Sequence, residues 1–246
     1  MTHGLFITFE GGDGVGKTTH IATLAKRLTQ YVATLDKQQF GRAQLAQQVF
    51  RDLAGPQQPV KPVPQYYSGV VTTCEPGGTA LGIQLRNIIL HGEPIDMRTE
   101  ALLYAADRAH HVATVIRPAL EAQKIVISDR YIDSSIAYQA EGRQLDADDI
   151  RHMSTWATDG LMPDLTFLLD ASPHVALKRL SGKPDRLEQE GSAFHERVRY
   201  AFLRAATREE KGAPSRWRII DTSQPFEAAS TEIFEHVMQH VGELPQ

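Results

Sequence analysis

The fold of this chain is decided by the stretch Gly11-Gly12-Asp13-Gly14-Val15-Gly16-Lys17-Thr18. It matches the phosphate-loop pattern G-x-x-x-x-G-K-[ST] in full. The apolar run Leu5-Phe6-Ile7-Thr8-Phe9 precedes it, and a segment with apolar residues at helical spacing follows it. The pattern needs this order of strand, turn and helix, because the N–H groups of the loop and the positive end of the helix bind phosphate together.

Two side chains at the end of the loop extend the prediction from a phosphate to a nucleotide. Lys17 would reach the β- and γ-phosphates, and the hydroxyl of Thr18 would bind Mg²⁺. The alternative is a glycine-rich turn without a ligand, which the strand and helix on either side argue against. We therefore predict a nucleotide-binding loop after the first strand.

The same alternation of strand and helix continues along the chain. Apolar, β-rich runs predict further strands at 70–73, 125–128, 165–169 and 217–220. Helical periodicity predicts helices at 79–91, 99–122 with a kink at Pro118, 146–158, 173–180, 192–211 and 225–241. Strands separated by helices form a parallel sheet with helices on both faces. The expected fold class is α/β, with a five-stranded parallel sheet.

Residues 36–67 depart from this alternation. The first half is rich in glutamine and has Ala46, Val49, Phe50 and Leu53 at helical spacing, and residues 55–64 hold four of the 13 prolines. An α/β unit normally uses a short connection at this point. We expect a surface excursion without chemistry, and an element that binds a partner is the alternative.

Composition excludes several classes of function. Lysine and arginine number 26 against 30 aspartates and glutamates, so the formal net charge is −4. Such a chain lacks the broad basic surface that binds nucleic acid or an anionic membrane, although a local basic pocket would still accept a phosphorylated ligand. A single cysteine allows no internal disulfide. With no run of 18 apolar residues and no basic signal region at the start, we expect a soluble, cytoplasmic protein.

Residues outside the loop distinguish kinases from GTPases and motors. A GTPase carries an N/T-K-x-D motif after a strand, and the nearest match here, Lys183-Pro184-Asp185, follows Gly182 in a polar turn. Asp129 ends the predicted third strand, where a carboxylate can face Mg²⁺, and Arg130 follows it, which suits binding of a second phosphate. Taken alone, a solvated ion pair is an equal alternative for Asp129 and Arg130.

Further stretches behind the loop closely resemble bacterial thymidylate kinases: Glu75-Pro76-Gly77-Gly78-Thr79, Tyr104-Ala105-Ala106-Asp107-Arg108, residues 129–139, Pro163-Asp164-Leu165-Thr166 and residues 185–190. The resemblance covers 5–34 and 68–241. It implies a single P-loop nucleoside-monophosphate-kinase domain over 1–246, with 36–67 as an insertion atypical of the family and a mobile lid at 179–191. It also implies a homodimer that transfers the γ-phosphoryl group of ATP to dTMP with Mg²⁺, giving dTDP for dTTP biosynthesis.

The resemblance gives each matching residue of the acceptor site a role. Tyr104 stands where the family stacks an aromatic ring on thymine, although taken alone it fits a core position better. Arg108, one turn later, matches the arginine that hydrogen-bonds the base. Asp13 resembles the carboxylate that faces the 3′-hydroxyl of the acceptor, and Arg130 resembles the arginine on its phosphate. The positions that line the nucleoside pocket are Ser135, Tyr138 and Gln139. Tyr138 would crowd the 2′ position and so favour deoxyribose.

The resemblance also fixes the donor side and the catalytic set. The implied ATP-binding residues are Gly11, Gly12, Asp13, Gly14, Val15, Gly16, Lys17, Thr18, Thr19 and Arg179. The implied catalytic residues are Lys17, Arg130, Asp129, Arg186 and Asp13, and the implied Mg²⁺ ligands are Thr18 and Asp129. Some relatives carry a catalytic arginine at the position of Gly14 and others carry it in the lid, so this chain resembles the lid-arginine type. Arg186 is the main candidate, ahead of Arg179 and Lys183.

Some features stay outside this assignment. Many bacterial relatives have an arginine that helps to hold the acceptor where this chain has Cys74, which we expect to be a small residue packed at the strand end. The pairs His110-His111 and His236/His240 lack the carboxylate or thiolate that would complete a metal site, so we expect none. Two other functions are open at this point: a kinase for another nucleotide or a nucleoside, and a nucleotide-binding protein without turnover.

Overall fold

The computed structural model describes residues 4–52, 67–180, 184–208 and 215–243, and for 36–52 and 243 it describes the backbone alone. One five-stranded sheet runs through the molecule with the strand order β2-β3-β1-β4-β5. Every neighbouring pair is parallel. The strands are β1 (Leu5–Glu10), β2 (Val70–Cys74), β3 (Ile125–Asp129), β4 (Leu165–Asp170) and β5 (Trp217–Asp221). The predicted fold class and all five strands are confirmed.

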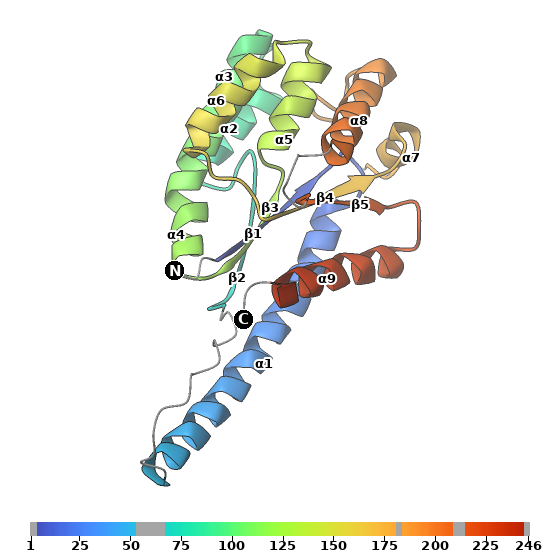
Figure 1. Ribbon diagram of the computed structural model, residues 1–246. Coiled ribbons are helices and arrows are strands. Elements are labelled where there is room, and N and C mark those ends of the chain that lie inside the picture. The colour runs from blue at the N-terminus through green and yellow to red at the C-terminus, as the bar shows by residue number, and fades with distance from the viewer. Residues whose placement is uncertain (1–3, 53–66, 181–183, 209–214, 244–246) are drawn as a thin grey trace.

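Helices cover both faces of this sheet (Figure 1). One face carries α1 (Lys17–Asp52) and α9 (Phe226–Glu243). The other carries α2 (Ala80–His91), α3 (Met97–His111), η1 (Val112–Ile116), α4 (Arg117–Glu121), α5 (Ile132–Ser135), η2 (Ile136–Gly142), α6 (Ala147–Thr158), α7 (Pro173–Leu177) and α8 (Ser192–Thr207). Among the described helices, none is long and apolar enough to cross a membrane.

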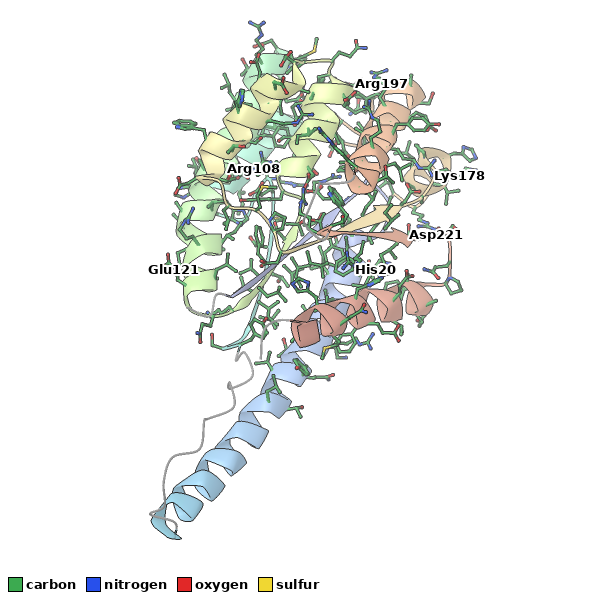
Figure 2. The ribbon with its side chains drawn as sticks, viewed as in Figure 1. His20, Arg108, Glu121, Lys178, Arg197 and Asp221 are labelled. Carbon is green, nitrogen blue, oxygen red and sulfur yellow. The ribbon has the colours of Figure 1, made fainter. Side chains whose placement is uncertain are left out.

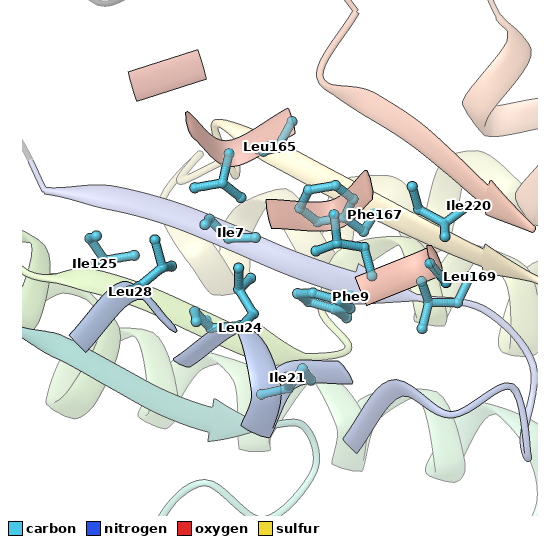
Figure 3. Packing of buried hydrophobic residues seen from close by; sticks show 14 of the residues in the cluster. Ile7, Phe9, Ile21, Leu24, Leu28, Ile125, Leu165, Phe167, Leu169 and Ile220 are labelled. Carbon is cyan, nitrogen blue, oxygen red and sulfur yellow. The ribbon is translucent and has the colours of Figure 1, made fainter. Parts of the chain in front are cut away.

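The central strand β1 is buried on both faces, which explains its uninterrupted apolar run. Ile7 and Phe9 point to the α1 and α9 side, where they pack with Leu24, Leu28 and Ile220 (Figure 3). Phe6 points to the opposite side and belongs to a separate cluster with residues of η1 and α4. β1 therefore lies between β3 and β4 in the sheet and packs against a hydrophobic cluster on each face.

Three helical regions differ from the sequence-based expectation. The helix expected over 99–122 with a kink at Pro118 is interrupted one turn earlier, by the π-helix η1, and Pro118 lies in the first turn of α4, where its missing N–H is not needed. The helices expected over 173–180 and 192–211 end at Leu177 and Thr207. A helical segment over 132–142 was not predicted, because its small and polar residues show no helical periodicity.

The excursion expected over 36–67 begins as a continuation of α1 and not as a separate piece. The helix runs without a break to Asp52 and projects away from the sheet (Figure 1). Residues 55–64, the proline-rich part, lie outside the described residues. Tyr67, at the far end, is fully buried in the same core cluster as Val32 of α1. The end of the excursion is therefore part of the core.

Candidate active site

The phosphate loop lies at the carboxyl end of β1, and three of its glycines adopt positive φ. Gly11, Gly14 and Gly16 have φ of 129°, 78° and 95°. A Cβ at Gly14 would lie 2.0 Å from the carbonyl oxygen of Ala176, and a Cβ at Gly11 would lie 2.3 Å from that of Leu169. Because backbone fills this space, neither position accommodates a side chain without movement. The loop thus requires glycine at Gly14 for a steric reason as well as a conformational one.

Lys17 and Thr18 stand at the junction of the loop with α1. The Nζ of Lys17 donates to the carbonyl oxygens of Gly11 and Gly12, at 3.2 and 2.8 Å. Burial, together with the charge of Arg130, lowers the pKa of Lys17 to about 8. Thr18 and Thr19 are exposed at the start of α1.

Thr18 also reaches the end of β3. Its hydroxyl donates to Oδ2 of Asp129 at 3.1 Å, so the two residues that the sequence predicts as Mg²⁺ ligands are neighbours. One hydroxyl and one carboxylate suit Mg²⁺, which keeps several waters and takes further oxygens from phosphates. Among the described residues, no group of three or more His, Cys, Asp or Glu side chains forms an all-protein metal site.

Asp13, Arg130 and Tyr138 form a connected polar group beside the loop. Arg130 has φ of 71°, and its Nη2 forms an ion pair with Asp13 and lies 3.1 Å from the hydroxyl of Tyr138. The hydroxyl of Tyr138 donates to the other oxygen of Asp13 at 2.8 Å. Burial alone would raise the pKa of Asp13, but the charges of Arg130 and Lys17 outweigh it and hold that pKa below its usual range. Asp13 is therefore a carboxylate at neutral pH.

A pocket opens on the side of this group away from α1. All seven residues predicted to bind the acceptor line it: Asp13, Tyr104, Arg108, Arg130, Ser135, Tyr138 and Gln139. They come from the loop, α3, the end of β3, α5 and η2, segments far apart in the sequence. The geometry thus brings together what the sequence predicted as one site.

The base-binding candidates of this pocket differ in their settings. Tyr104 packs against the apolar cluster formed by α2, η2 and α8, and burial raises the pKa of its hydroxyl. Arg108 is only 2% exposed and lies among the helices on the sheet face opposite α1 and α9 (Figure 2). Gln139 donates to the buried carboxylate of Glu100 at 3.0 Å. These side chains are held by protein contacts, so the pocket is preorganised.

Residues of the expected lid lie beside the pocket that the predicted acceptor-binding residues line, and one of them contacts Glu100. Asp185 and Leu187 line the pocket. The guanidinium of Arg186 lies outside it, with Nε donating to the carbonyl oxygen of Ile89 at 2.8 Å and Nη2 to Glu100 at 2.7 Å. The structure therefore does not bring Arg186 to the phosphate loop in this conformation.

The other two lid candidates are on the donor side or undescribed. Arg179 donates to the carbonyl oxygen of Thr222 at 3.0 Å, near His20 and the start of α1. Lys183 lies outside the described residues. Arg179 therefore lies away from the pocket that the predicted acceptor-binding residues line. This position is compatible with its predicted place on the ATP side.

Several site residues were missed from sequence. Glu10, at the end of β1, is fully buried and accepts from the Tyr131 N–H at 2.9 Å and from the Ser134 hydroxyl at 2.6 Å. Burial and the nearby charge of Asp133 raise the pKa of Glu10 to about 7. His195 of α8 is buried beside Gly11, Gly12 and Asp13. Nothing in local periodicity marks either position, because their neighbours come from distant segments.

Arg86 lies near Cys74, the residue that stands where many bacterial relatives have an arginine. Arg86 of α2 lines the acceptor pocket and donates to the carbonyl oxygen of Pro76 at 3.0 Å. Cys74 is partly buried at the end of β2 and does not line the pocket, and burial raises the pKa of its thiol. The charge of Arg86 acts on that thiol, which places a guanidinium close to Cys74.

Comparison with known proteins agrees with this geometry. The family model described as thymidylate kinase matches residues 63–233. A thymidylate kinase of Leifsonia xyli subsp. xyli is 47% identical over 234 residues, covering 94% of this chain and 92% of the relative. A thymidylate kinase of Cupriavidus pinatubonensis is 42% identical over 232 residues, covering 94% of this chain and 96% of the relative. With its nearly full-length matches, its parallel sheet and its phosphate loop, the chain belongs to the thymidylate kinase family.

Proposed function

We propose that the phosphate loop binds ATP and that the adjoining pocket binds dTMP, so that the γ-phosphoryl group passes directly between them. The overall reaction is that of the family, the phosphorylation of dTMP to dTDP. One observation supports the residue-level assignment: Asp13 belongs to the phosphate loop and also lines the pocket proposed for the acceptor. A group shared by two nucleotide sites lies where their phosphates must meet.

On the donor side, the backbone of residues 11–18 and the amino end of α1 bind the phosphates of ATP, and Lys17 neutralises their charge. Thr18 and Asp129 would hold Mg²⁺, which when bound neutralises charge on the phosphates. The exposed Thr19 and the more distant Arg179 complete the ATP site on the side of the nucleoside. Catalysis of phosphoryl transfer depends mainly on positioning the reactants and stabilising charge, and these groups do both.

On the acceptor side, Arg130 binds the phosphate of dTMP, Tyr104 stacks on the base and Arg108 hydrogen-bonds it. Ser135 and Gln139 complete the wall, and Arg86 supplies a second guanidinium where many relatives use the position of Cys74. Asp13 accepts from the 3′-hydroxyl of the sugar, and the ring of Tyr138 excludes a 2′-hydroxyl. Arg130 already has its guanidinium 4.8 Å from the centre of that ring, so the two act as one rigid wall.

The lid supplies the remaining positive charge in this proposal. Gly14 has no room for a side chain, so a loop arginine is sterically excluded and the lid-arginine type is favoured. Arg186 is the assigned residue, and closing of the lid at 179–191 over bound nucleotides would move it from Glu100 to the transferring group. Its contact with a buried carboxylate holds it beside the site until then.

An assay of ADP release with ATP and Mg²⁺, over dTMP, dUMP, dCMP, dGMP and thymidine, tests the assignment. We expect dTMP to be the best acceptor and thymidine a poor one, because Arg130 needs an acceptor phosphate. Faster turnover of thymidine would overturn the acceptor assignment. The Lys17→Ala variant should lose turnover and keep the melting temperature within a few degrees, and retained turnover at saturating ATP would contradict the role of Lys17.

The protein would act as a cytoplasmic homodimer. Large apolar side chains are exposed on three neighbouring helices: Leu81, Ile83 and Ile88 of α2, Met97 and Leu102 of α3, and Trp156 of α6. Exposed apolar side chains gathered on neighbouring helices support an interface between two copies on this side of the protein. Light scattering should show a dimer that Leu102→Asp disrupts, whereas Tyr200→Asp on α8, equally exposed at 59%, should leave it intact.

A further inference from the structure

The carboxylate of Glu75 is shared by two side chains of α3. Its Oε2 accepts from Nε of Arg108 at 2.7 Å, and its Oε1 lies 2.9 Å from Nδ1 of His111. The side chains of Glu75 and Arg108 are each 2% exposed, and that of His111 is fully buried. Because a buried guanidinium needs a countercharge, Glu75 is ionised and can only accept, so the proton of His111 is on Nδ1.

The glycine-rich stretch after Glu75 is shaped around this arrangement. His111 is held on its other side by a hydrogen bond between Nε2 and the hydroxyl of Thr73. A Cβ at Gly78 would lie 2.5 Å from Nε2 of His111, and a Cβ at Gly82 would lie 2.3 Å from Oδ1 of Asp107. The absence of side chains at Gly78 and Gly82 therefore leaves space for His111 and Asp107 of α3, and the ring of His111 is confined between Gly78, Thr73 and Glu75.

The contacts of Arg108 use four of its five N–H groups. Besides Nε, its Nη1 donates to the hydroxyls of Ser135 and Ser154, at 3.1 and 3.3 Å, and its Nη2 donates to the carbonyl oxygen of Tyr131 at 3.0 Å. Within the described part of the chain, the second N–H of Nη2 is left without an acceptor. Since Arg108 lines the acceptor pocket, this N–H is the one available to a ligand.

We propose that Glu75 and His111 are positioning residues that fix the plane of the Arg108 guanidinium and thereby help to select the base. A guanidinium only donates, so it favours a base edge that carries a carbonyl oxygen. Thymine has a carbonyl oxygen at position 4, where cytosine has an amino group. A guanidinium fixed on several sides cannot turn to avoid the amino group, whereas a loosely held one can. The inference rests on the assignment of Arg108 to the base.

Substitutions at His111 separate positioning from packing. An asparagine in its place would keep a donor near the position of Nδ1, whereas a leucine of similar size removes it. We expect His111→Leu to raise KM for dTMP about tenfold, the order of one lost hydrogen bond to a charged group, and to lower the preference for dTMP over dCMP. His111→Asn should stay within about threefold of the native protein in both quantities. KM for ATP should not change in either variant, because the donor site lies beyond Asp13.

Two further variants keep the test decisive. Glu75→Gln, which leaves a single acceptor for two donors, should reproduce the His111→Leu effect and covers the case in which that variant does not fold. His110→Leu, at the exposed neighbouring position, is the matched control and should behave as native. If His111→Leu and Glu75→Gln lower only the melting temperature and leave the dTMP to dCMP ratio unchanged, Glu75 and His111 are structural and the inference is wrong.

Arg108→Lys, measured in the same assay, separates the role of Arg108 in base binding from the positioning role of Glu75 and His111. A lysine keeps the charge and loses the planar donor set. If Arg108→Lys changes the dTMP to dCMP ratio and the Glu75 and His111 variants do not, the positioning inference fails while the role of Arg108 stands. If Arg108→Lys leaves the ratio unchanged, the assignment of Arg108 to the base fails, and the inference fails with it.

Discussion

Asp13 and Arg130 form an ion pair between the phosphate loop and the residue that follows β3. Both belong to the wall of the acceptor pocket, and each is also bonded to the hydroxyl of Tyr138. The pair holds a carboxylate and a guanidinium at the place where the phosphate and sugar of the acceptor would bind. If either group exchanges its charged partner for a ligand, the other keeps its hydrogen bond to the hydroxyl of Tyr138.

The ring of Tyr138, and not its hydroxyl, should set the preference for deoxyribose. Tyr138→Phe keeps the ring, so we expect it to retain the native ratio of kcat/KM for dTMP over ribothymidine 5′-monophosphate. Tyr138→Ala removes the steric barrier and should lower that ratio by about tenfold or more. Steady-state kinetics on both substrates measures it. Equal ratios in the Ala and native proteins would remove Tyr138 from sugar selection.

Replacing Arg186 should affect the transition state more than binding. An arginine aimed at the transferring group contributes roughly 10³- to 10⁵-fold in rate, so Arg186→Ala should lower kcat far more than it raises KM for dTMP. Its contact with Glu100 in the present conformation provides a second possible outcome. A rise in KM with kcat within a few-fold would make Arg186 a residue that docks the lid and would leave Arg179 or Lys183 as the catalytic candidate.

Gly14 should be far less tolerant of a methyl group than Gly12. A Cβ at Gly14 meets the Ala176 carbonyl at 2.0 Å and the backbone there has positive φ, whereas a Cβ at Gly12 meets nothing within 4 Å. We expect Gly14→Ala to destabilise the protein by at least about 1 kcal/mol and Gly12→Ala to stay within about 0.5 kcal/mol. Urea unfolding of both variants compares them, and equal midpoints would contradict the packing of α7 on the loop.

Glu10 should make stability fall as pH rises toward neutrality. Its pKa is raised from 4.5 to about 7 in the folded protein, so the folded state binds the proton more tightly than the unfolded state. The stabilisation is complete below about pH 4.5 and is lost as pH rises through about 7. Between pH 5.5 and 8, the melting temperature of the Glu10→Gln variant should therefore fall less than that of the native protein. Glu121→Gln, at an exposed position, should follow the native curve.

The excursion should be dispensable for catalysis. Val32, just before the excursion, and Tyr67, its last residue, are buried in the same core cluster, so the chain returns to the core that it leaves. Closing a shorter loop costs little entropy. We expect replacement of residues 37–65 by a short Gly/Ser link to leave a folded protein with kcat for dTMP within a few-fold. Lost turnover in a variant whose circular dichroism is native would show that the excursion belongs to the active site.

The sequence predicted the sheet because strands give local signals, whereas the residues that line the pocket were expected from the resemblance to thymidylate kinases, and their roles remain predictions. Apolar runs mark strands, and motifs such as the phosphate loop and the Asp129-Arg130 pair lie at strand ends that a parallel sheet gathers at one edge. The continuation of α1 to Asp52 was missed, because a glutamine-rich, amphipathic segment has the same sequence pattern whether it forms a separate helix or extends the preceding one. The raised pKa of Glu10 depends on Asp133, Ser134 and burial, which only the fold brings together.

Two adjacent histidines also show that the sequence alone does not tell which side chain is buried or what it contacts. His110 and His111 are adjacent and equally polar, yet His110 is exposed and His111 is buried against Glu75 and Thr73. Both ring nitrogens of His111 therefore have hydrogen-bond partners within the protein. Its partner, however, lies on a different segment, and no spacing within α3 indicates Glu75.

The central position of β1 has a consequence for synthesis of the protein. Its register joins Leu5 to Ile125 on one side and Ile7 to Leu165 on the other. The ribosome delivers this apolar strand first, and neither neighbour exists until much of the chain has been translated. The sheet therefore cannot form around β1 until β3 and β4 have been translated, and this apolar strand has no strand partner until then.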